Sequence, residues 1–298
     1  MADTAATPTR AELEWYATPG PMTTLPDDLG RLPADAEELR RLLPGLVIHG
    51  DLRWAYGIDA PPPMAEMNIR PAAAMVGVVL GRDAGPLVTP RAPADRMVGV
   101  CRHFATLHTA LLRRQGIPAR ARCGFAAYFE AGRWTDHWVT EYWDAGRDRW
   151  VRADPQLDET LLSRLGITVD PADLPADAFL TGGDAWLCHR WGSCDAQLFG
   201  IADLRGPWFV AGNVVRDLAA LNKVEVLPWD VWGPLGAWID EGPDDDLVDA
   251  LAVAATGGTS RPSGWGTGSW DEVRAAYRSH PWIPVSDDGR ELVPVREQ

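Results

Sequence analysis

Three side chains in one stretch of the sequence have the types needed for nucleophilic acyl chemistry: a cysteine, a histidine and an aspartate. Cys101 follows the apolar run 97–100 and opens a segment, 101–115, in which apolar residues recur at helical spacing. Gly116 and Pro118 end that segment, so the pattern predicts a helix that begins at or just after Cys101. A helix N-terminus stabilises a thiolate, the reactive form of cysteine. The alternative is a buried structural thiol.

His137 and Asp154 lie in segments that are rich in aromatic and small apolar residues, which predicts strands over 119–129, 134–143 and 149–154. Residues that face each other in an antiparallel hairpin have a constant sum of residue numbers. The sum 137 + 154 = 291 centres the hairpin between residues 145 and 146, inside the expected turn 144–148. The sequence therefore permits His137 and Asp154 to be direct cross-strand neighbours, about 5 Å apart at Cβ. Alone, His137 could equally be a half-buried strand histidine.

Five short motifs carry a resemblance to a known family. They are GVCRHFA at 99–105, GIPAR at 116–120, CGF at 123–125, DHWV at 136–139 and WVRADP at 150–155. Together they resemble the transglutaminase-like core of the papain-like cysteine enzymes, over about a fifth of the chain (95–160). The resemblance implies that Cys101 is the nucleophile, that His137 is the general base and acid, and that Asp154 orients the imidazole.

The rest of the chain, notably NVVRDLAALNK at 213–223 and LPWDVWG at 227–233, resembles a bacterial branch of this superfamily. The calcium sites and flanking β-domains of animal transglutaminases are not evident, so protein crosslinking is not implied. The reaction implied is attack by the Cys101 thiolate on an amide or thioester of a small molecule or peptide, through a thioester intermediate. We favour a hydrolase of the amidase or peptidase kind. The alternatives are an amide-forming acyltransferase of a biosynthetic pathway and a non-catalytic binding protein that retains the three residues.

Further residues are weaker candidates for substrate binding or for the oxyanion hole. The backbone N–H of Cys101 is the natural first donor to an oxyanion. Side-chain candidates are Asn68, Trp54, His103, Gln156 and Lys223. Lys223 is the only lysine beside 27 arginines, although simple exposure would also explain it. Cys188, His189 and Cys194 suggest a structural metal, but no second paired-ligand motif accompanies them, so we expect neither metal nor cofactor.

These candidates need a fold to position them, and the patterns favour an α+β protein. We expect one transglutaminase-like domain over 1–298, with a helical N-terminal lead-in, a catalytic core at 95–160 and a tryptophan-rich extension at 161–298 packed on that core. Segment 75–80 fits either a helix or a strand. The other expected helices are 36–43 with Asp35 as its N-cap, a short one within 174–186, one over 214–221, one that starts near 244–246, and one over 273–277 after a capping box at Ser269 and Glu272.

Composition excludes several classes of protein. The 298 residues carry a net charge of −14, which opposes binding to nucleic acid or to anionic lipid. The longest apolar run, 72–80, is too short to cross a bilayer, and residues 1–10 do not resemble a secretory signal. We therefore expect a cytoplasmic protein with all four cysteines as thiols. Its oligomeric state is left open.

Overall fold

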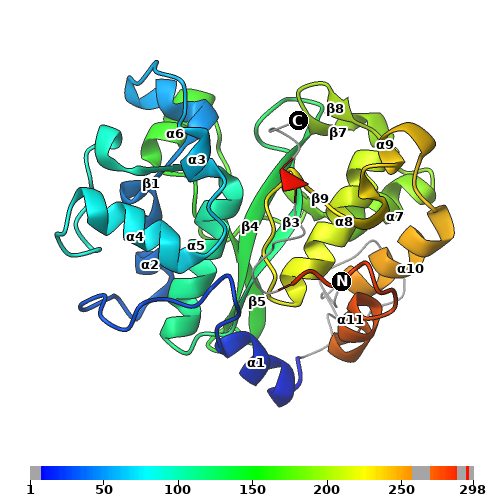
Figure 1. Cartoon of the computed structure of the whole chain (residues 1–298), viewed down its shortest axis with the longest axis horizontal. Helices are drawn as coiled ribbons and strands as arrows, with labels where there is room; N and C mark the ends of the chain where they lie inside the picture. Colours follow the sequence, from blue (N-terminus) through cyan, green and yellow to red (C-terminus); the bar gives the residue numbers. More distant parts are fainter. Residues whose placement is uncertain (1–7, 257–268, 287–292, 295–298) are drawn as a thin grey trace. The chain divides into compact units, whose positions relative to one another are not determined.

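The structure is a computed structural model that describes residues 8–256, 269–286 and 293–294 (Figure 1). It is an α+β protein, as the sequence predicts. The chain divides into two compact units. We call Leu13–Ala121 with Val139–Leu174 the Cys101 unit, and Met1–Glu12 with Arg122–Trp138 and Pro175–Gln298 the His137 unit. The expectation of one domain over 1–298 stays a prediction.

The elements of the Cys101 unit are mostly helical. They are α2 (Ala36–Leu42), η1 (Leu43–Gly45), β1 (Val47–His49), η2 (Gly50–Tyr56), α3 (Met64–Met67), α4 (Ala72–Arg82), η3 (Pro93–Asp95), β2 (Met97–Gly99), α5 (Cys101–Arg114), β5 (Arg149–Ala153) and α6 (Glu159–Leu165). Three elements extend across the division between the units: α1 (Arg10–Ala17), β3 (Ala119–Ala126) and β4 (Trp134–Asp144).

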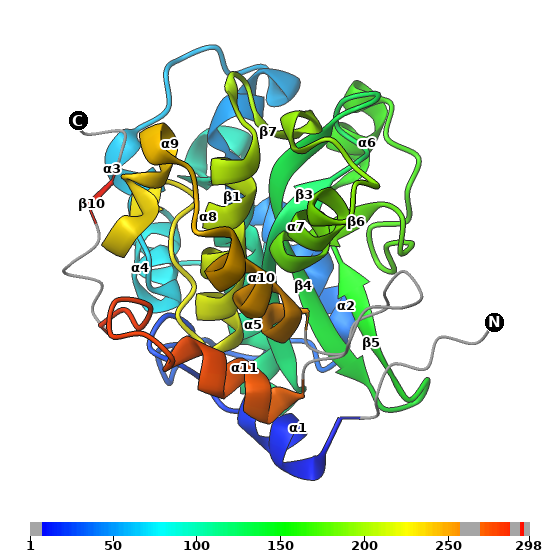
Figure 2. The same cartoon turned by 90° about the vertical axis from the view of Figure 1, so that its right-hand side faces the viewer.

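The His137 unit contains the C-terminal helices. Its elements are β6 (Phe179–Thr181), α7 (Gly182–Arg190), η4 (Ala196–Leu198), β7 (Phe199–Ile201), β8 (Leu204–Arg205), α8 (Pro207–Leu221), β9 (Asp230–Val231), η5 (Gly233–Leu235), α9 (Trp238–Glu241), α10 (Asp245–Ala255), α11 (Trp270–Tyr277) and β10 (Val293–Pro294). Helices α7, α8 and α10 pack against one another, as Figure 2 shows.

Helix α5 is the centre of the Cys101 unit. Its side chains are buried from Cys101 to Arg113, and it packs against α2 and α4 (Figure 1). Phe104, Leu107 and Leu111 join the apolar core on the predicted spacing. Gly116 then takes a left-handed conformation (φ +74°), which a glycine adopts without steric cost, and the helix ends. The start and end predicted for this helix are confirmed to within one residue.

The six-stranded sheet has the order β6-β3-β4-β7-β8, and β5 pairs with β4. The antiparallel register of β4 and β5 runs from Thr140↔Ala153 to Asp144↔Arg149, so the sum of residue numbers is 293. The hairpin therefore does not have the sum of residue numbers, 291, that would pair His137 with Asp154. These two residues are not direct cross-strand neighbours. The hairpin is centred one residue later because Asp148 adopts a left-handed conformation (φ +51°) and closes a four-residue loop.

Most of the other expected elements are confirmed. Asp35 caps α2 by accepting from the Glu38 N–H, and Ser269 forms the expected capping box at α11. Asp244 caps α10, and the undecided segment 75–80 is part of the helix α4. Strand β3 stops at Ala126, three residues earlier than expected.

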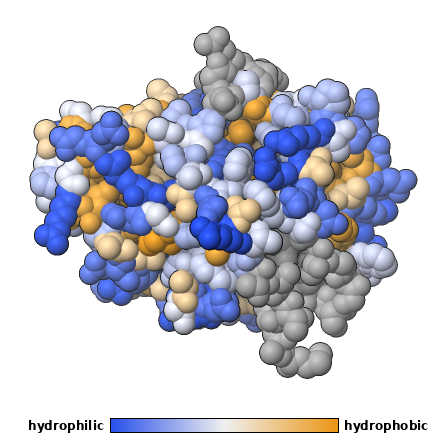
Figure 3. Space-filling model, turned by 90° about the horizontal axis from the view of Figure 1, so that it is seen from below, coloured by the Kyte–Doolittle hydropathy of each residue, from blue (hydrophilic) through white to orange (hydrophobic). Residues whose placement is uncertain are grey.

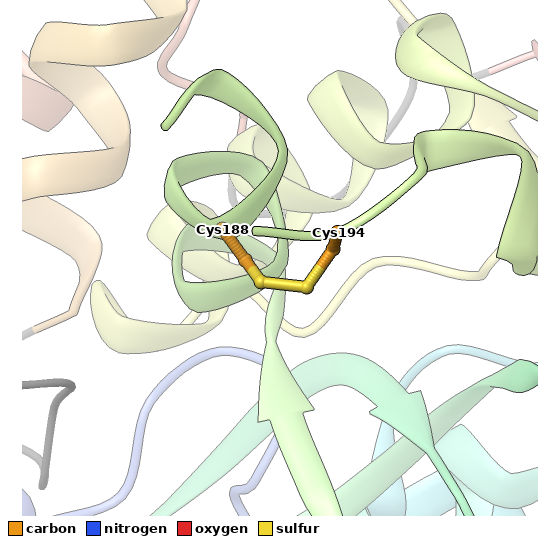
Figure 4. The surroundings of a disulfide bond; sticks show 2 residues. All are labelled: Cys188 and Cys194. Atoms are coloured by element: carbon orange, nitrogen blue, oxygen red, sulfur yellow. A yellow bond between two sulfur atoms is a disulfide. The ribbon is translucent and has the colours of Figure 1, made fainter. Parts of the chain in front are cut away.

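Two cysteines form a disulfide, so the prediction that all four are thiols is wrong. Cys188, near the end of α7, is bonded to Cys194 in the loop that follows (Figure 4). Their Cα atoms are 5.3 Å apart, within the range that a disulfide spans. The bond removes both sulfurs as metal-ligating thiolates. The cytoplasmic location stays a prediction. Cys101 and Cys123 are outside any disulfide.

The surface mixes polar and apolar side chains. The face in Figure 3 shows hydrophobic patches separated by hydrophilic residues. Within the part of the chain that the structure describes, no helix is long and apolar enough to cross a membrane.

A buried ion pair ties β3 to α8 in the His137 unit. The Arg122 guanidinium donates to both carboxylate oxygens of Asp217, at 3.0 and 2.8 Å, and the Cys123 N–H donates to the same carboxylate at 2.8 Å. Both charged side chains are fully buried. Because a buried carboxylate that loses its cation pays the full cost of desolvation, the pair matters most when one partner is removed.

We expect Arg122→Met to lower the free energy of unfolding by about 3–5 kcal/mol, since it leaves the Asp217 carboxylate buried without its cation. Urea denaturation measures the change. Arg133→Met, which breaks an exposed pair with Glu130, is the matched control and should cost less than about 1 kcal/mol. Equal losses for the two variants would contradict this account.

Stability should also depend on pH through His108, in the core of the Cys101 unit. Burial is the main cause that lowers the pKa of His108, to about 4 from the ordinary 6.5. The folded state therefore keeps a neutral ring where the unfolded state binds a proton, and the free energy of unfolding falls as pH drops from about 6.5 to 4, by up to about 3 kcal/mol. Urea denaturation measures the free energy of unfolding at each pH. Between pH 6.5 and 4 this free energy should change less for His108→Gln than for the wild type, whereas His280→Gln should follow the wild type.

Candidate functional site

Cys101 is the first residue of α5, and only 6% of it is exposed. Strand β2, paired in parallel with β1, leads directly into it. The turn is tight: a Cβ at Gly99 would lie 2.8 Å from the Cβ of His103, so position 99 requires glycine. The thiol therefore lies at the N-terminus of a 14-residue helix, where backbone N–H groups favour the thiolate.

His103 supports the backbone at Cys101. Its ring is fully buried, and its Nδ1 accepts a hydrogen bond from the Val100 N–H at 3.0 Å. Burial, and then the nearby Arg102 charge, hold the pKa of His103 well below its usual range, so the ring is neutral. This ring satisfies the backbone at the helix start, and its role in substrate binding or in the oxyanion hole stays a prediction.

His137 lies on β4, is buried, and contacts two adjacent aromatic rings from the loop after β3. Tyr128 and Phe129 meet the imidazole edge-on, with ring centroids at 6.0 and 4.9 Å. Both are half-buried. Neither ring was among the predicted site residues; the available signal was their place at the end of the predicted strand 119–129, next in sequence to the strand that carries His137.

Asp154 follows β5 and is fully buried. Its carboxylate accepts from the Gln156 N–H at 2.9 Å, and its own N–H donates to the Pro171 carbonyl at 2.8 Å. Arg40 of α2 donates to the carbonyl groups of Asp154 (3.4 Å) and Leu157 (3.0 Å). These bonds hold 154–157 in one conformation. Arg40 lies more than a hundred residues away in sequence, and no local pattern marks it.

Strand alternation sets the face on which His137 lies. His137 and Glu141 are on the same face of β4. Glu141 is the cross-strand partner of Arg152 on β5, and its carboxylate accepts a charged hydrogen bond of 2.8 Å from that guanidinium.

The weaker candidates have different environments. Trp54 in η2 is 49% exposed, and Asn68 ends α3 with its backbone N–H bonded to the Met64 carbonyl. Gln156 is buried beside Asp154 in sequence. Lys223 follows α8 in a left-handed conformation (φ +67°) and is only 4% exposed, so simple exposure does not explain it. Lys223 and His137 belong to one unit, and the other candidates belong to the Cys101 unit.

No metal site stands out in the described part of the chain, where no group of three or more histidine, cysteine, aspartate or glutamate side chains is arranged to hold an ion.

Comparison with known families bears on residues 87–155, which match a sequence model of the transglutaminase-like superfamily. This segment is transglutaminase-like. It starts before β2, includes α5, β3, β4 and β5, and ends one residue after Asp154. The transglutaminase-like segment thus contains Cys101, His137 and Asp154, and the resemblance found in the motifs is confirmed. The match supports a cysteine-dependent enzyme in general terms.

A candidate cysteine protease from Cytophaga hutchinsonii is a solved structure with limited similarity, at 15% sequence identity and a TM-score of 0.25. The alignment covers 59% of this chain and 49% of that one, so the chain spans about half the length of this neighbour. A likeness this slight supports no argument. No curated protein matches the chain.

The Arg40 contacts lead to a local prediction. Arg40→Met removes charge-assisted hydrogen bonds to 154–157, each worth about 1.5–3 kcal/mol, so amide hydrogen exchange there should accelerate about 10- to 100-fold. Arg41→Met is the control, because the Arg41 side chain is 69% exposed and pairs with Glu37 on the same helix. Unchanged exchange at Gln156 and Leu157 in Arg40→Met would show that Arg40 does not hold this segment.

Proposed function

We propose that this protein is a cysteine-dependent acyl-transfer enzyme in which Cys101 is the nucleophile, His137 the general base and acid, and Asp154 the residue that orients the imidazole. The observation that carries the proposal is the transglutaminase-like segment 87–155, which contains the three residues in the family's order and begins a helix at Cys101. The burial of all three side chains supports it, because ion pairs and hydrogen bonds are stronger away from water.

The proposed reaction starts from a Cys101 thiolate and a His137 imidazolium. The sulfur attacks the acyl carbon, the C–S bond forms, and the carbonyl oxygen becomes an oxyanion. The bond to the leaving amine or thiol then breaks, and the imidazolium proton passes to that leaving group. A thioester on Cys101 remains. His137 next takes a proton from water as the water attacks, and the acid and the thiolate are released.

The oxyanion needs donors that are in place before the reaction. The backbone N–H of Cys101 is the first that we propose, because a helix N-terminus leaves its initial N–H groups without helical acceptors. Asn68, Trp54 or Gln156 would supply a second, and Lys223 a substrate contact. The substrate that we propose is an amide or thioester of a small molecule or peptide, and no cofactor enters the reaction.

The test uses the two cysteines that lie outside the disulfide. Cys101 and Cys123 are both buried, so a large difference in their reactivity reports chemistry and not only access. We expect iodoacetamide to alkylate Cys101 of the native protein at least about ten times faster than Cys123, by mass spectrometry of the digested protein. His137→Ala should remove most of that difference. Equal labelling of the two thiols in the wild type would count against an activated nucleophile.

A second measurement identifies the acceptor. Incubation with p-nitrophenyl acetate should place an acetyl group on Cys101, and the Cys101→Ser variant should lack the thioester. Adding methylamine separates the two reactions: acetate as the sole product indicates the hydrolase that we favour, and N-methylacetamide indicates the acyltransferase. A wild-type protein that never acylates would favour the non-catalytic binding protein.

A further inference from the structure

The backbone beside His137 is held by a buried hydrogen-bond chain in the His137 unit. Successive side chains of a strand point to opposite faces, so Asp136 and His137 project from opposite sides of β4. The Asp136 carboxylate is buried and accepts from Asn213 Nδ2 of α8 at 2.7 Å. Whatever fixes Asp136 therefore also fixes the direction in which the next side chain leaves the strand.

The Asn213 amide has only one orientation that satisfies its neighbours. Its Nδ2 faces the Asp136 carboxylate and, at 3.5 Å, the Gly124 carbonyl, both of which only accept. Its Oδ1 accepts from the Arg216 guanidinium at 3.1 Å, which only donates. Arg216 in turn donates to the Asp230 carbonyl at 3.2 Å. An asparagine, with a donor and an acceptor side by side, is the residue that this position requires.

Backbone packing keeps Asn213 in place. A Cβ added at Gly182 of α7 would lie 2.5 Å from the carbonyl carbon and oxygen of Asn213. The two helices are therefore in backbone contact at this point, and Asn213 itself is fully buried. The backbone of Asn213 is therefore held against α7.

The charge on Asp136 depends on the same chain. Burial raises the pKa of Asp136, and the Asn213 hydrogen bond and the Arg216 charge oppose that effect. Loss of the amide would therefore remove one of the two interactions named here that favour the charged carboxylate.

We propose that Asn213 is a positioning residue for His137. Through Asp136 it anchors β4 to α8 and so sets the angle of the imidazole, without touching the substrate. The inference rests on the proposed role of His137 as general base and acid. It predicts that the rate falls when position 213 no longer donates a hydrogen bond to position 136. It also predicts that the rate recovers when the amide and the carboxylate are exchanged between these two positions.

The test compares acylation of Cys101 by p-nitrophenyl acetate in four proteins. Asn213→Asp sets a carboxylate against the Asp136 carboxylate. We expect kcat to fall about 10- to 100-fold, which corresponds to the loss of one charged hydrogen bond, and KM to stay within about twofold of the wild type. The double variant Asp136→Asn/Asn213→Asp restores one amide and one carboxylate and keeps a carboxylate facing Arg216. Its kcat should return to within about threefold of the wild type.

Asn222→Asp is the matched control, because Asn222 directly follows the same helix and its side-chain amide donates to the Leu218 carbonyl at 2.9 Å, away from Asp136. It should retain wild-type kcat. Wild-type kcat in Asn213→Asp overturns the inference. So does an equal loss in Asn213→Asp and the double variant, which indicates a purely structural role. A wild-type protein that is not acylated at Cys101 overturns the proposed function itself, and this inference with it.

Discussion

Side chains alternate between the two faces of strand β4, and this alternation determines which residues the strand presents on each face. One face of the strand carries Asp136 and Thr140, which bond to α8 and to α5: Asp136 through Asn213, and Thr140 through its hydroxyl to the Ala105 carbonyl at 3.2 Å. The other face carries His137 and Glu141. A shift of the strand by one residue would exchange the two sets, so the bonds on the first face fix what the second presents.

Buried arginines hold the strands at this place. Glu141 accepts from Arg120 of β3 at 2.9 Å and from Arg152 of β5 at 2.8 Å, so one carboxylate joins three strands. Arg122 meets Asp217 with two hydrogen bonds. The planar guanidinium makes such paired bonds, which a lysine ammonium does not. The bias toward arginine in the composition therefore has a structural use in the core.

The sequence predicts the elements around Cys101 well because their signals are local. Helical spacing, Gly116 and the aromatic strands all act within a few residues, and the helix at 101–114 and the three strands follow from them. The hairpin register differs by two residues from the one that would pair His137 with Asp154. The left-handed conformation of Asp148 sets the length of the loop, and an aspartate does not require that conformation. The disulfide was missed because the expectation came from the presumed compartment and not from the six-residue spacing of the cysteines.

Hydrogen-bond partners that are far apart in the sequence could not be predicted from local sequence patterns. Arg40 reaches Leu157 across 117 positions, and Asn213 reaches Asp136 across 77. Such pairs depend on how helices pack on strands, which periodicity does not encode. Cys101, His137 and Asp154, by contrast, were recognised from their residue types and their order in the sequence. The reactivity of Cys101 tests the roles that we propose for them.

The backbone contact between α7 and α8 at Gly182 has an evolutionary consequence. A Cβ at position 182 would meet backbone atoms of Asn213, which every residue at position 213 carries, so glycine is required at 182 whatever residue stands at 213. Relatives in which the two helices meet in the same way should therefore keep this glycine, even in lineages that have replaced the asparagine thirty-one positions after it. Loss of the glycine would mark, from sequence alone, lineages in which the two helices have moved apart.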